Sequence, residues 1–134
     1  MRHWLVKQEP EAYSFAAFRA DRTTVWDGVR NAQARIHLRA MAKGDAVLWY
    51  ATGAVKAVVG TATVARAPYP DPADPAWVAV DLKAGRPFAS PVTLAQVRAD
   101  PVLAQTALVT HTRLSVLPLT APQHARFLEF GGLV

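Results

Sequence analysis

Four prolines in eight residues divide the middle of the chain. The segment PYPDPADP, at 68–75, separates VKAVVGTATVAR, at 55–66, from WVAVDLK, at 77–83. Because proline has no N–H to donate to a strand ladder, we expect 68–75 to be a loop. The flanking segments are rich in β-branched residues and largely alternate in polarity, which predicts two strands. Gly60, inside the first strand, indicates a bulge or a point of close approach.

Other short strands and helices are predicted on both sides of this loop. Strands are expected at 3–7, 46–52 and 112–116, and helices at 15–20, 31–42, 93–99 and from 120 to the glycine pair at 131–132. Four residues have the type and spacing of helix N-caps: Ser14, Asn31, Thr93 and Thr120. Regular βαβ alternation is lacking. We therefore predict one α+β domain over 1–134, with a mixed, mostly antiparallel sheet curled into a small barrel and helices packed outside.

Composition excludes several kinds of site. The chain has no cysteine, so disulfides and thiolate metal sites are excluded, and its four histidines have no metal-ligand spacing. We expect no metal, no cofactor and no membrane span, and a cytoplasmic location. Lysine and arginine number 15 against 10 acidic residues, giving a formal charge of +5. That excess favours an anionic partner such as nucleic acid.

Common motifs of enzymatic chemistry are absent. The sequence has no G-x-G-x-x-G, no P-loop and no G-x-S-x-G. Asp71 and Asp74 could form a carboxylate pair, but a solvated turn in the proline loop explains them better. Glu9, Asp27 and Asp45 each have a reading as turn or cap residues. We therefore predict a protein without catalytic activity, and keep an enzyme acting on nucleic acid as the weaker alternative.

The stretch TTVWDGVRN, at 23–31, places a tryptophan directly before an Asp-Gly turn signal. Trp26 can stack on a base, which is worth about 1–3 kcal/mol. Arg30 and Asn31 can contact a base edge or a phosphate, and so can the polar segment 7–9 at the end of the first strand. The alternative is that Trp26 packs inward and Asn31 only caps a helix. Both interpretations remain open.

Basic residues recur every four positions after this stretch, at Arg35, Arg39 and Lys43. Such a ridge can meet phosphates, or it can be a solvated helix face. Trp4, Trp49 and Trp77 lie in strand patterns and are expected in the core or on a sheet face. Tyr50 must point to the face opposite Trp49, so one of the two can face a pocket.

Four segments together resemble the EVE domain family of the PUA-like superfamily. They are HWLVKQEP, TTVWDGVRNAQARIHLRAMAKGDAVLWY, APYPDP and RLSV. The resemblance implies a PUA-like, barrel-like sheet surrounded by short helices. It also implies a pocket for a modified base, such as a modified cytosine, in DNA or RNA, by analogy with the aromatic cage of the related YTH domains. The protein would be a monomer or a weak dimer. A pocket for a free nucleobase or nucleotide is the alternative.

The resemblance also assigns residues to that pocket. They are Lys7, Gln8, Glu9, Trp26, Val29, Arg30, Asn31, Tyr50, Thr52, Arg113, Leu114 and Ser115. Three departures from the family pattern bear on the ligand. Gln8 replaces a serine, Ala51 and Thr52 stand where His-Ser is frequent, and the loop after Asp71 is shorter than in many members.

Overall fold

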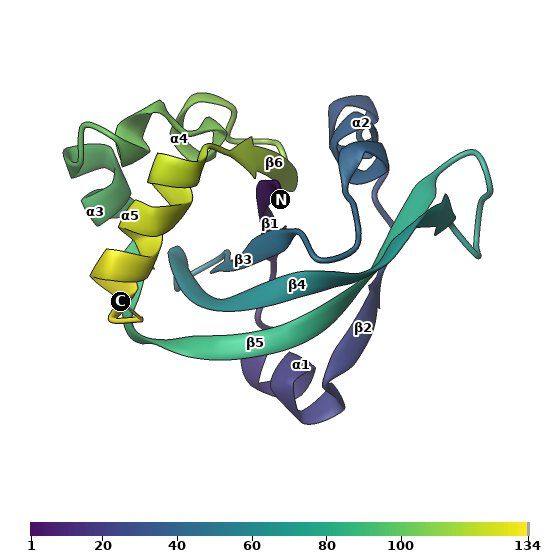
Figure 1. Cartoon of the computed structure of the whole chain (residues 1–134), viewed down its shortest axis with the longest axis horizontal. Coiled ribbons are helices and arrows are strands. Elements are labelled where there is room, and N and C mark those ends of the chain that lie inside the picture. Colours follow the sequence, from purple (N-terminus) through teal and green to yellow (C-terminus); the bar gives the residue numbers. More distant parts are fainter. Residues whose placement is uncertain (134) are drawn as a thin grey trace.

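Six strands form one mixed sheet in the computed structural model, which describes residues 1–133 and, at position 67, only the backbone. The sheet order is β2-β5-β4-β3-β1-β6 (Figure 1). Only β1 and β3 pair in parallel, and the other neighbours are antiparallel. This confirms the predicted α+β, mostly antiparallel class. The strands are β1 (His3–Gln8), β2 (Thr23–Trp26), β3 (Ala46–Ala51), β4 (Ala57–Pro70), β5 (Val78–Thr93) and β6 (Val116–Leu119).

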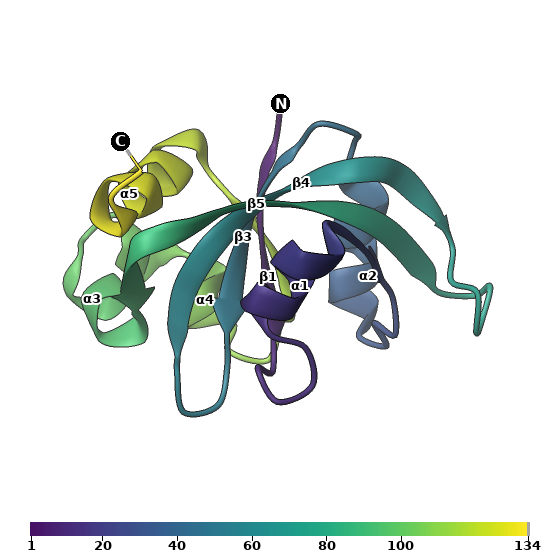
Figure 2. The same ribbon diagram turned by 90° about the horizontal axis from the view of Figure 1, so that it is seen from below.

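In the described part of the chain, five α-helices and one 3-10 turn surround the sheet. They are α1 (Phe15–Asp21), α2 (Ala32–Ala40), α3 (Leu94–Ala99), η1 (Leu103–Gln105), α4 (Ala107–Thr110) and α5 (Ala121–Gly131). Helices α3, α4 and α5 lie together at one end of the sheet, away from α1 and α2 (Figures 1 and 2). The predicted N-caps hold, because the side chains of Ser14, Asn31, Thr93 and Thr120 all accept backbone N–H groups. Within residues 1–133, every helix is too short or too polar to span a bilayer.

The proline loop is shorter than predicted. Strand β4 continues to Pro70, and β5 runs from Val78 to Thr93, well beyond the predicted end at 83. Strand β3 pairs with β4 only as far as Thr63, so the last residues of β4 have a partner on one side alone. The missing N–H of a proline costs little on such an open edge. Pro87 in β5 is tolerated for the same reason, because it lies outside the part of β5 that pairs with β2.

Two further elements differ from the sequence prediction. Residues 112–115 form a turn, and the last strand begins only at Val116 and includes Pro118. This is again an edge strand, where proline is tolerated. Strand β2, the turn η1 and helix α4 were not predicted. All three are four residues or fewer, which is too short for a clear periodic pattern.

The core consists of two clusters, one on each side of the sheet. Trp49 packs with Phe15, Phe18 and Trp26 in one cluster, while Tyr50 belongs to the other. This confirms that neighbouring strand residues point to opposite faces. Gly60 lies at a register shift, and a Cβ there would overlap the ring of Phe15. The predicted bulge and close approach at Gly60 are therefore both observed.

Candidate functional site

A pocket of about 260 Å³ lies where the C-terminal ends of β1 and β2 meet the segment leading into α2. It brings together part of the predicted site, namely Lys7, Gln8, Trp26, Val29, Arg30, Asn31 and Ser115. We call it the Trp26 pocket. In the sheet order β5, β4 and β3 lie between β2 and β1, and the successive antiparallel pairs make β2 run opposite to β1, so strand pairing alone does not bring these two ends together.

Trp26 forms the inner wall of this pocket and belongs to the core. Its side chain is only 6% exposed, and its ring meets Trp49 edge to face with centroids 5.2 Å apart. Trp26 therefore packs inward, as one of the two interpretations has it, and it also lines the pocket, while base stacking stays a prediction. Trp26→Ala would therefore destabilise the fold, because truncating a buried tryptophan costs about 3–5 kcal/mol.

Asp71 fixes the segment that follows Trp26. One carboxylate oxygen accepts the backbone N–H of Gly28 at 3.0 Å and the Arg30 guanidinium at 3.1 Å. The other accepts the N–H of Ala73 at 2.8 Å. These bonds, led by the one from Gly28, lower the pKa of Asp71 to about 2. The side chain is buried, so its interpretation as part of a solvated turn was wrong.

The turn after Trp26 aims two polar side chains at the pocket. Gly28 adopts φ +74°, a left-handed conformation that glycine accepts without strain. The Asn31 side-chain oxygen accepts the N–H of Ala34 at 2.9 Å and caps α2, which leaves its amide nitrogen to face a ligand. One guanidinium nitrogen of Arg30 donates hydrogen bonds to the Asp71 carboxylate and to the backbone carbonyl of Val29. Its remaining N–H groups are the ones that can donate to a ligand.

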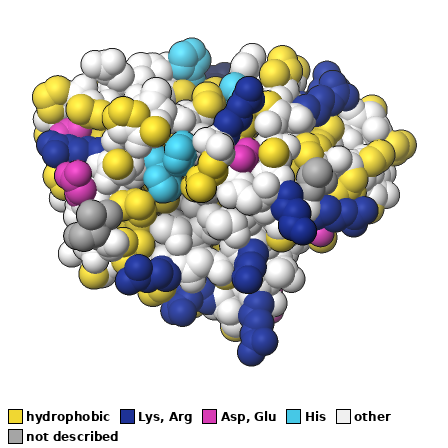
Figure 3. All heavy atoms as spheres, in the orientation of Figure 1, with side chains coloured by type: hydrophobic (Ala, Val, Ile, Leu, Met, Phe, Trp, Pro, Cys, Tyr) yellow, Lys and Arg dark blue, Asp and Glu magenta, His cyan; other side chains and the backbone are white. Residues whose placement is uncertain are grey.

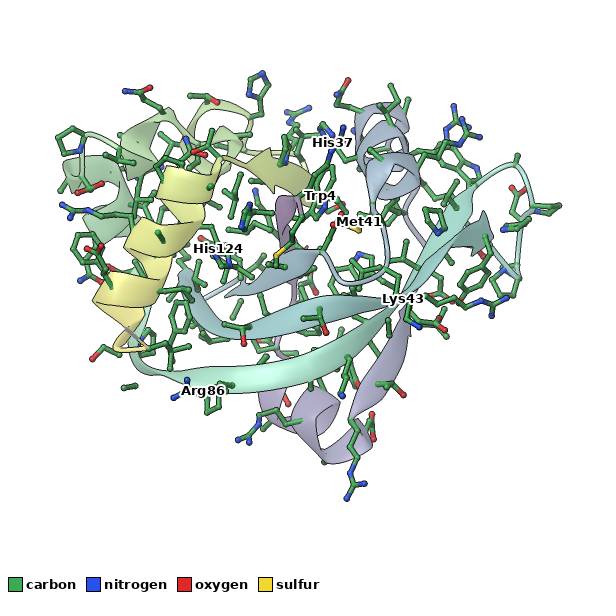
Figure 4. All side chains as sticks on the ribbon, viewed as in Figure 1. Trp4, His37, Met41, Lys43, Arg86 and His124 are labelled. Carbon is green, nitrogen blue, oxygen red and sulfur yellow. The ribbon has the colours of Figure 1, made fainter. Side chains whose placement is uncertain are left out.

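Asp45 ties the turn that follows α2 to the start of β1. Asp45 accepts the Trp4 indole N–H at 3.0 Å and the Ala42 backbone N–H at 2.9 Å. Burial raises the pKa of Asp45, but these bonds and one from the Arg2 backbone outweigh it and leave the pKa lowered. Trp4 and Met41 lie between α2 and the sheet, with His37 above them on the helix (Figure 4). The expected cap role of Asp45 is thus observed.

Lys7 and Gln8 close the pocket on the β1 side. The Lys7 ammonium donates to the carbonyl of Thr112 at 3.0 Å, and burial lowers the pKa of Lys7. The Gln8 side-chain oxygen accepts the N–H of Glu9 at 2.9 Å, which leaves the amide nitrogen as a donor. The Lys7 backbone N–H bonds to the carbonyl of Ser115, which explains how Ser115 reaches this pocket from a distant part of the chain.

The remaining predicted pocket residues lie elsewhere. Glu9 is exposed and outside the Trp26 pocket, and so is Arg113. Leu114 is buried in the turn before β6. Tyr50 and Thr52 line a different pocket of about 200 Å³, which Lys7 also borders. The sequence-based site therefore divides between two neighbouring pockets.

The basic ridge is not continuous along α2. The helix ends at Ala40, so Lys43 lies in the turn beyond it, and only Arg39 is an exposed helical member of the set. Arg35 is half-buried, with its guanidinium 4.6 Å over the ring of Trp77 and bonded to the carbonyl of Ala76. Trp77 precedes β5 and lies outside both core clusters. Lysine and arginine side chains are spread over the lower and right-hand parts of the face in Figure 3.

Several lining residues were not predicted. They are Tyr13, Thr24, Val25, Asp27 and Gly28. Thr24 and Val25 belong to β2, so recognising that strand would have identified them. Tyr13 lies before α1, and its hydroxyl donates to Asp21 at 2.6 Å. Nothing in its local sequence indicates a pocket, because it arrives there through the packing of α1 beside β2.

Comparisons with known proteins agree with this architecture. The EVE domain model matches residues 2–130. Human thymocyte nuclear protein 1 is 30% identical over an alignment covering 88% of this chain and 68% of the human protein. An NMR structure of a Rhodopseudomonas palustris protein is 42% identical, with TM-score 0.95, and covers 100% of this chain and 95% of that one.

A further similar structure contains a ligand. It is a crystal structure of the human THYN1 protein in complex with DNA containing 5-methylcytosine, 28% identical to this chain, with TM-score 0.90. The similarity covers 98% of each chain. The resemblance noted in the sequence motifs is thereby confirmed, and the chain belongs to the EVE domain family.

Proposed function

We propose that this protein is a non-catalytic nucleic-acid-binding module that reads a modified base, with a modified cytosine in DNA as the first candidate. The observation that carries the proposal is the Trp26 pocket, where an indole wall meets convergent donors from Gln8, Arg30 and Asn31. Ligand sites commonly combine an apolar or aromatic wall with a few polar groups that fix orientation. A volume of about 260 Å³ suits one planar base rather than a larger ligand.

The chemistry of the lining supports a base over other flat molecules. Amide and guanidinium groups pair with base edges, and an aromatic wall gives sequence-tolerant stacking. The formal charge of +5 favours approach to a polyanion. The human relative crystallised with 5-methylcytosine DNA supplies the modification to test first. A base must leave its stack to enter such a pocket, which costs a few kcal/mol, so we expect modest affinity.

The test is a titration of short oligonucleotides that differ only in one cytosine methyl group, as DNA and as RNA, followed by tryptophan fluorescence and calorimetry. We expect tighter binding of a methylated strand, with affinity that falls as salt rises. Trp26→Phe should reduce the preference for the methylated strand. Trp49→Phe is the matched control, because Trp49 is buried against Trp26 but does not line the pocket.

Three results would contradict the proposal. Equal affinity for all oligonucleotides, modified or not, would remove base reading. Saturable binding of free nucleobases without any binding of oligonucleotides would favour the small-ligand alternative. Turnover of a bound strand would show that the protein is an enzyme.

A further inference from the structure

A second pocket lies on the other side of Lys7. Its volume is about 200 Å³, and its lining includes Lys7, Tyr50, Thr52, Lys56, Leu94 and Leu108. We call it the Thr52 pocket. Strands β1 and β3 run in parallel and end together, with Gln8 opposite Ala51. The chain that follows β3 forms one wall of this pocket, and Lys7 of β1 borders both this pocket and the Trp26 pocket.

The polar lining of the Thr52 pocket is cationic and hydroxylic. Lys7 and Lys56 supply two ammonium groups, and Tyr50, Thr52 and Thr112 supply hydroxyl groups. Among the described lining residues none is acidic, and neither lysine forms an ion pair with a described carboxylate. The carboxylate of Glu11 lies close to Gly53, which lines this pocket. These ammonium and hydroxyl groups can therefore bind an anion.

One atom in this lining has no partner. The Thr52 side-chain oxygen is inaccessible to solvent, yet it makes no hydrogen bond with any described residue. Its backbone N–H is held by the carbonyl of Gln8 at 3.0 Å, so the residue is fixed by an extension of the β1–β3 ladder. A buried hydroxyl without a partner is costly unless a ligand completes it.

The Lys7 ammonium also has hydrogen-bond donors that the described residues leave unused. Its ammonium makes one hydrogen bond, to the Thr112 carbonyl, and lies 5.9 Å from the centre of the Tyr50 ring. An ammonium has three donors, so two remain for a ligand. Burial without a counter-ion lowers the pKa of Lys7, and an anion in the pocket would reverse that effect.

We propose that the Thr52 pocket binds a phosphate group, supplied by the backbone of the strand whose base enters the Trp26 pocket. Lys7 and Lys56 neutralise its charge. The hydroxyl of Thr52, which solvent does not reach in the free protein, donates to one of its oxygens once a shift of the turn after β3 uncovers it. This assignment rests on the proposed function for its source of phosphate. A free phosphate or nucleotide has the same chemistry and is the other source to be tested.

The first experiment separates a ligand-binding hydroxyl from a structural one. Thr52→Val keeps the side-chain shape and removes the hydroxyl. Because that hydroxyl has no partner in the free protein, we expect the variant to be as stable as the wild type or more stable, but to bind oligonucleotide several-fold more weakly. Equal binding, or a loss of stability that accounts for weaker binding, would overturn the assignment.

The second experiment locates the phosphate. Single phosphates beside the modified base are replaced by neutral methylphosphonate, and each strand is titrated against wild type and Lys56→Gln. We expect one replacement to weaken wild-type binding and to have little further effect on Lys56→Gln, whose salt slope should fall by about one. Lys83→Gln, an exposed β5 lysine outside both pockets, is the control. Independent effects at every position would overturn the backbone source.

Two further measurements keep this inference distinct from base reading. Glu11→Gln should tighten binding, since it removes the acid close to Gly53. Inorganic phosphate alone should shift the amide NMR signals of Thr52 and Lys56. If no modified base is preferred but these signals respond, base reading fails and the anion site stands. If the signals do not respond and no phosphate position couples to Lys56, the anion site fails while base preference is judged separately.

Discussion

Arg30 is held by Asp71 across 41 positions of the chain, with a guanidinium nitrogen 3.1 Å from a carboxylate oxygen. The same oxygen accepts the Gly28 N–H, so one carboxylate fixes both ends of the turn at the pocket mouth. Asp71 lies just after β4, at the tip of the long β4–β5 hairpin. The shape of the Trp26 pocket is therefore set partly by a hairpin whose described residues do not line it.

Asp71→Asn should weaken oligonucleotide binding by about 10- to 100-fold, since charge-assisted hydrogen bonds contribute roughly 1.5–3 kcal/mol. When the amide nitrogen replaces the oxygen that Gly28 and Arg30 share, it cannot accept a hydrogen bond from either group. Calorimetric titration measures the effect. Asp74→Asn in the same loop is the control, because Asp74 bonds only to its own turn through the N–H of Ala76. Similar losses in both variants would exclude a specific role for Asp71.

Arg35 and Arg39 should separate into structural and electrostatic roles. Arg39→Gln removes an exposed cation, so the slope of log affinity against log salt should fall by about one. Arg35→Gln should leave that slope unchanged and lower unfolding free energy by about 0.5–1 kcal/mol, through loss of its contact with the Trp77 ring. Salt-dependent titrations and thermal unfolding test the pair. A reduced salt slope for Arg35→Gln would mean that this guanidinium leaves Trp77 on binding.

Gln8→Ser restores the residue type that the family pattern favours at this wall. We expect it to alter the ratio of affinities for methylated and unmethylated strands by about fivefold or more, since one base-edge contact gives roughly 1–3 kcal/mol of discrimination. Competition titrations with both strands measure the ratio. Glu9→Gln should leave the ratio unchanged, because Glu9 is exposed outside the pocket. An unchanged ratio in Gln8→Ser would remove Gln8 from the recognition surface.

His124 should make the fold sensitive to mild acid. Burial, with the nearby ring of His3, lowers the pKa of His124 to about 4. An unfolded histidine has a pKa of about 6.5, so the unfolded chain takes up a proton first as pH falls. The contribution of neutral His124 to the free energy of unfolding is therefore fully present above about pH 6.5. It declines as the pH falls from about 6.5 to about 4. Urea unfolding of wild type and His124→Gln across this range tests it, with a flatter profile expected for the variant.

Local sequence signals were sufficient for most of the fold. The helix caps, the strand at 46–51 and the alternation at Trp49 and Tyr50 depend on neighbouring residues, and all were predicted correctly. The strand ends were not, because whether proline is tolerated depends on which edges are open. Open edges follow from the sheet order, which is a property of the whole chain.

The lining of the Trp26 pocket was predicted best where it is contiguous in sequence, while Lys7 and Gln8 were singled out as a polar strand end and Ser115 only by the family resemblance. The turn from Trp26 to Asn31 carries its own chemistry and was recognised. Asp71 was missed because its partner Gly28 is 43 positions away and the two meet only once β4 reaches its full length. Arg35 was assigned to phosphate because helical spacing cannot show that Trp77 lies beneath it.

Lys7 borders both pockets, so if both proposals hold, a single ammonium would serve two ligand positions. A ligand in one pocket would change the hydration and the position of the Lys7 ammonium that a ligand in the other pocket meets. The two occupancies are then linked thermodynamically, and the linkage is reciprocal, because each ligand must alter the affinity of the other by the same factor. A base in its pocket and an anion beside it would thus act as one cooperative unit, with the end of β1 as the coupling element.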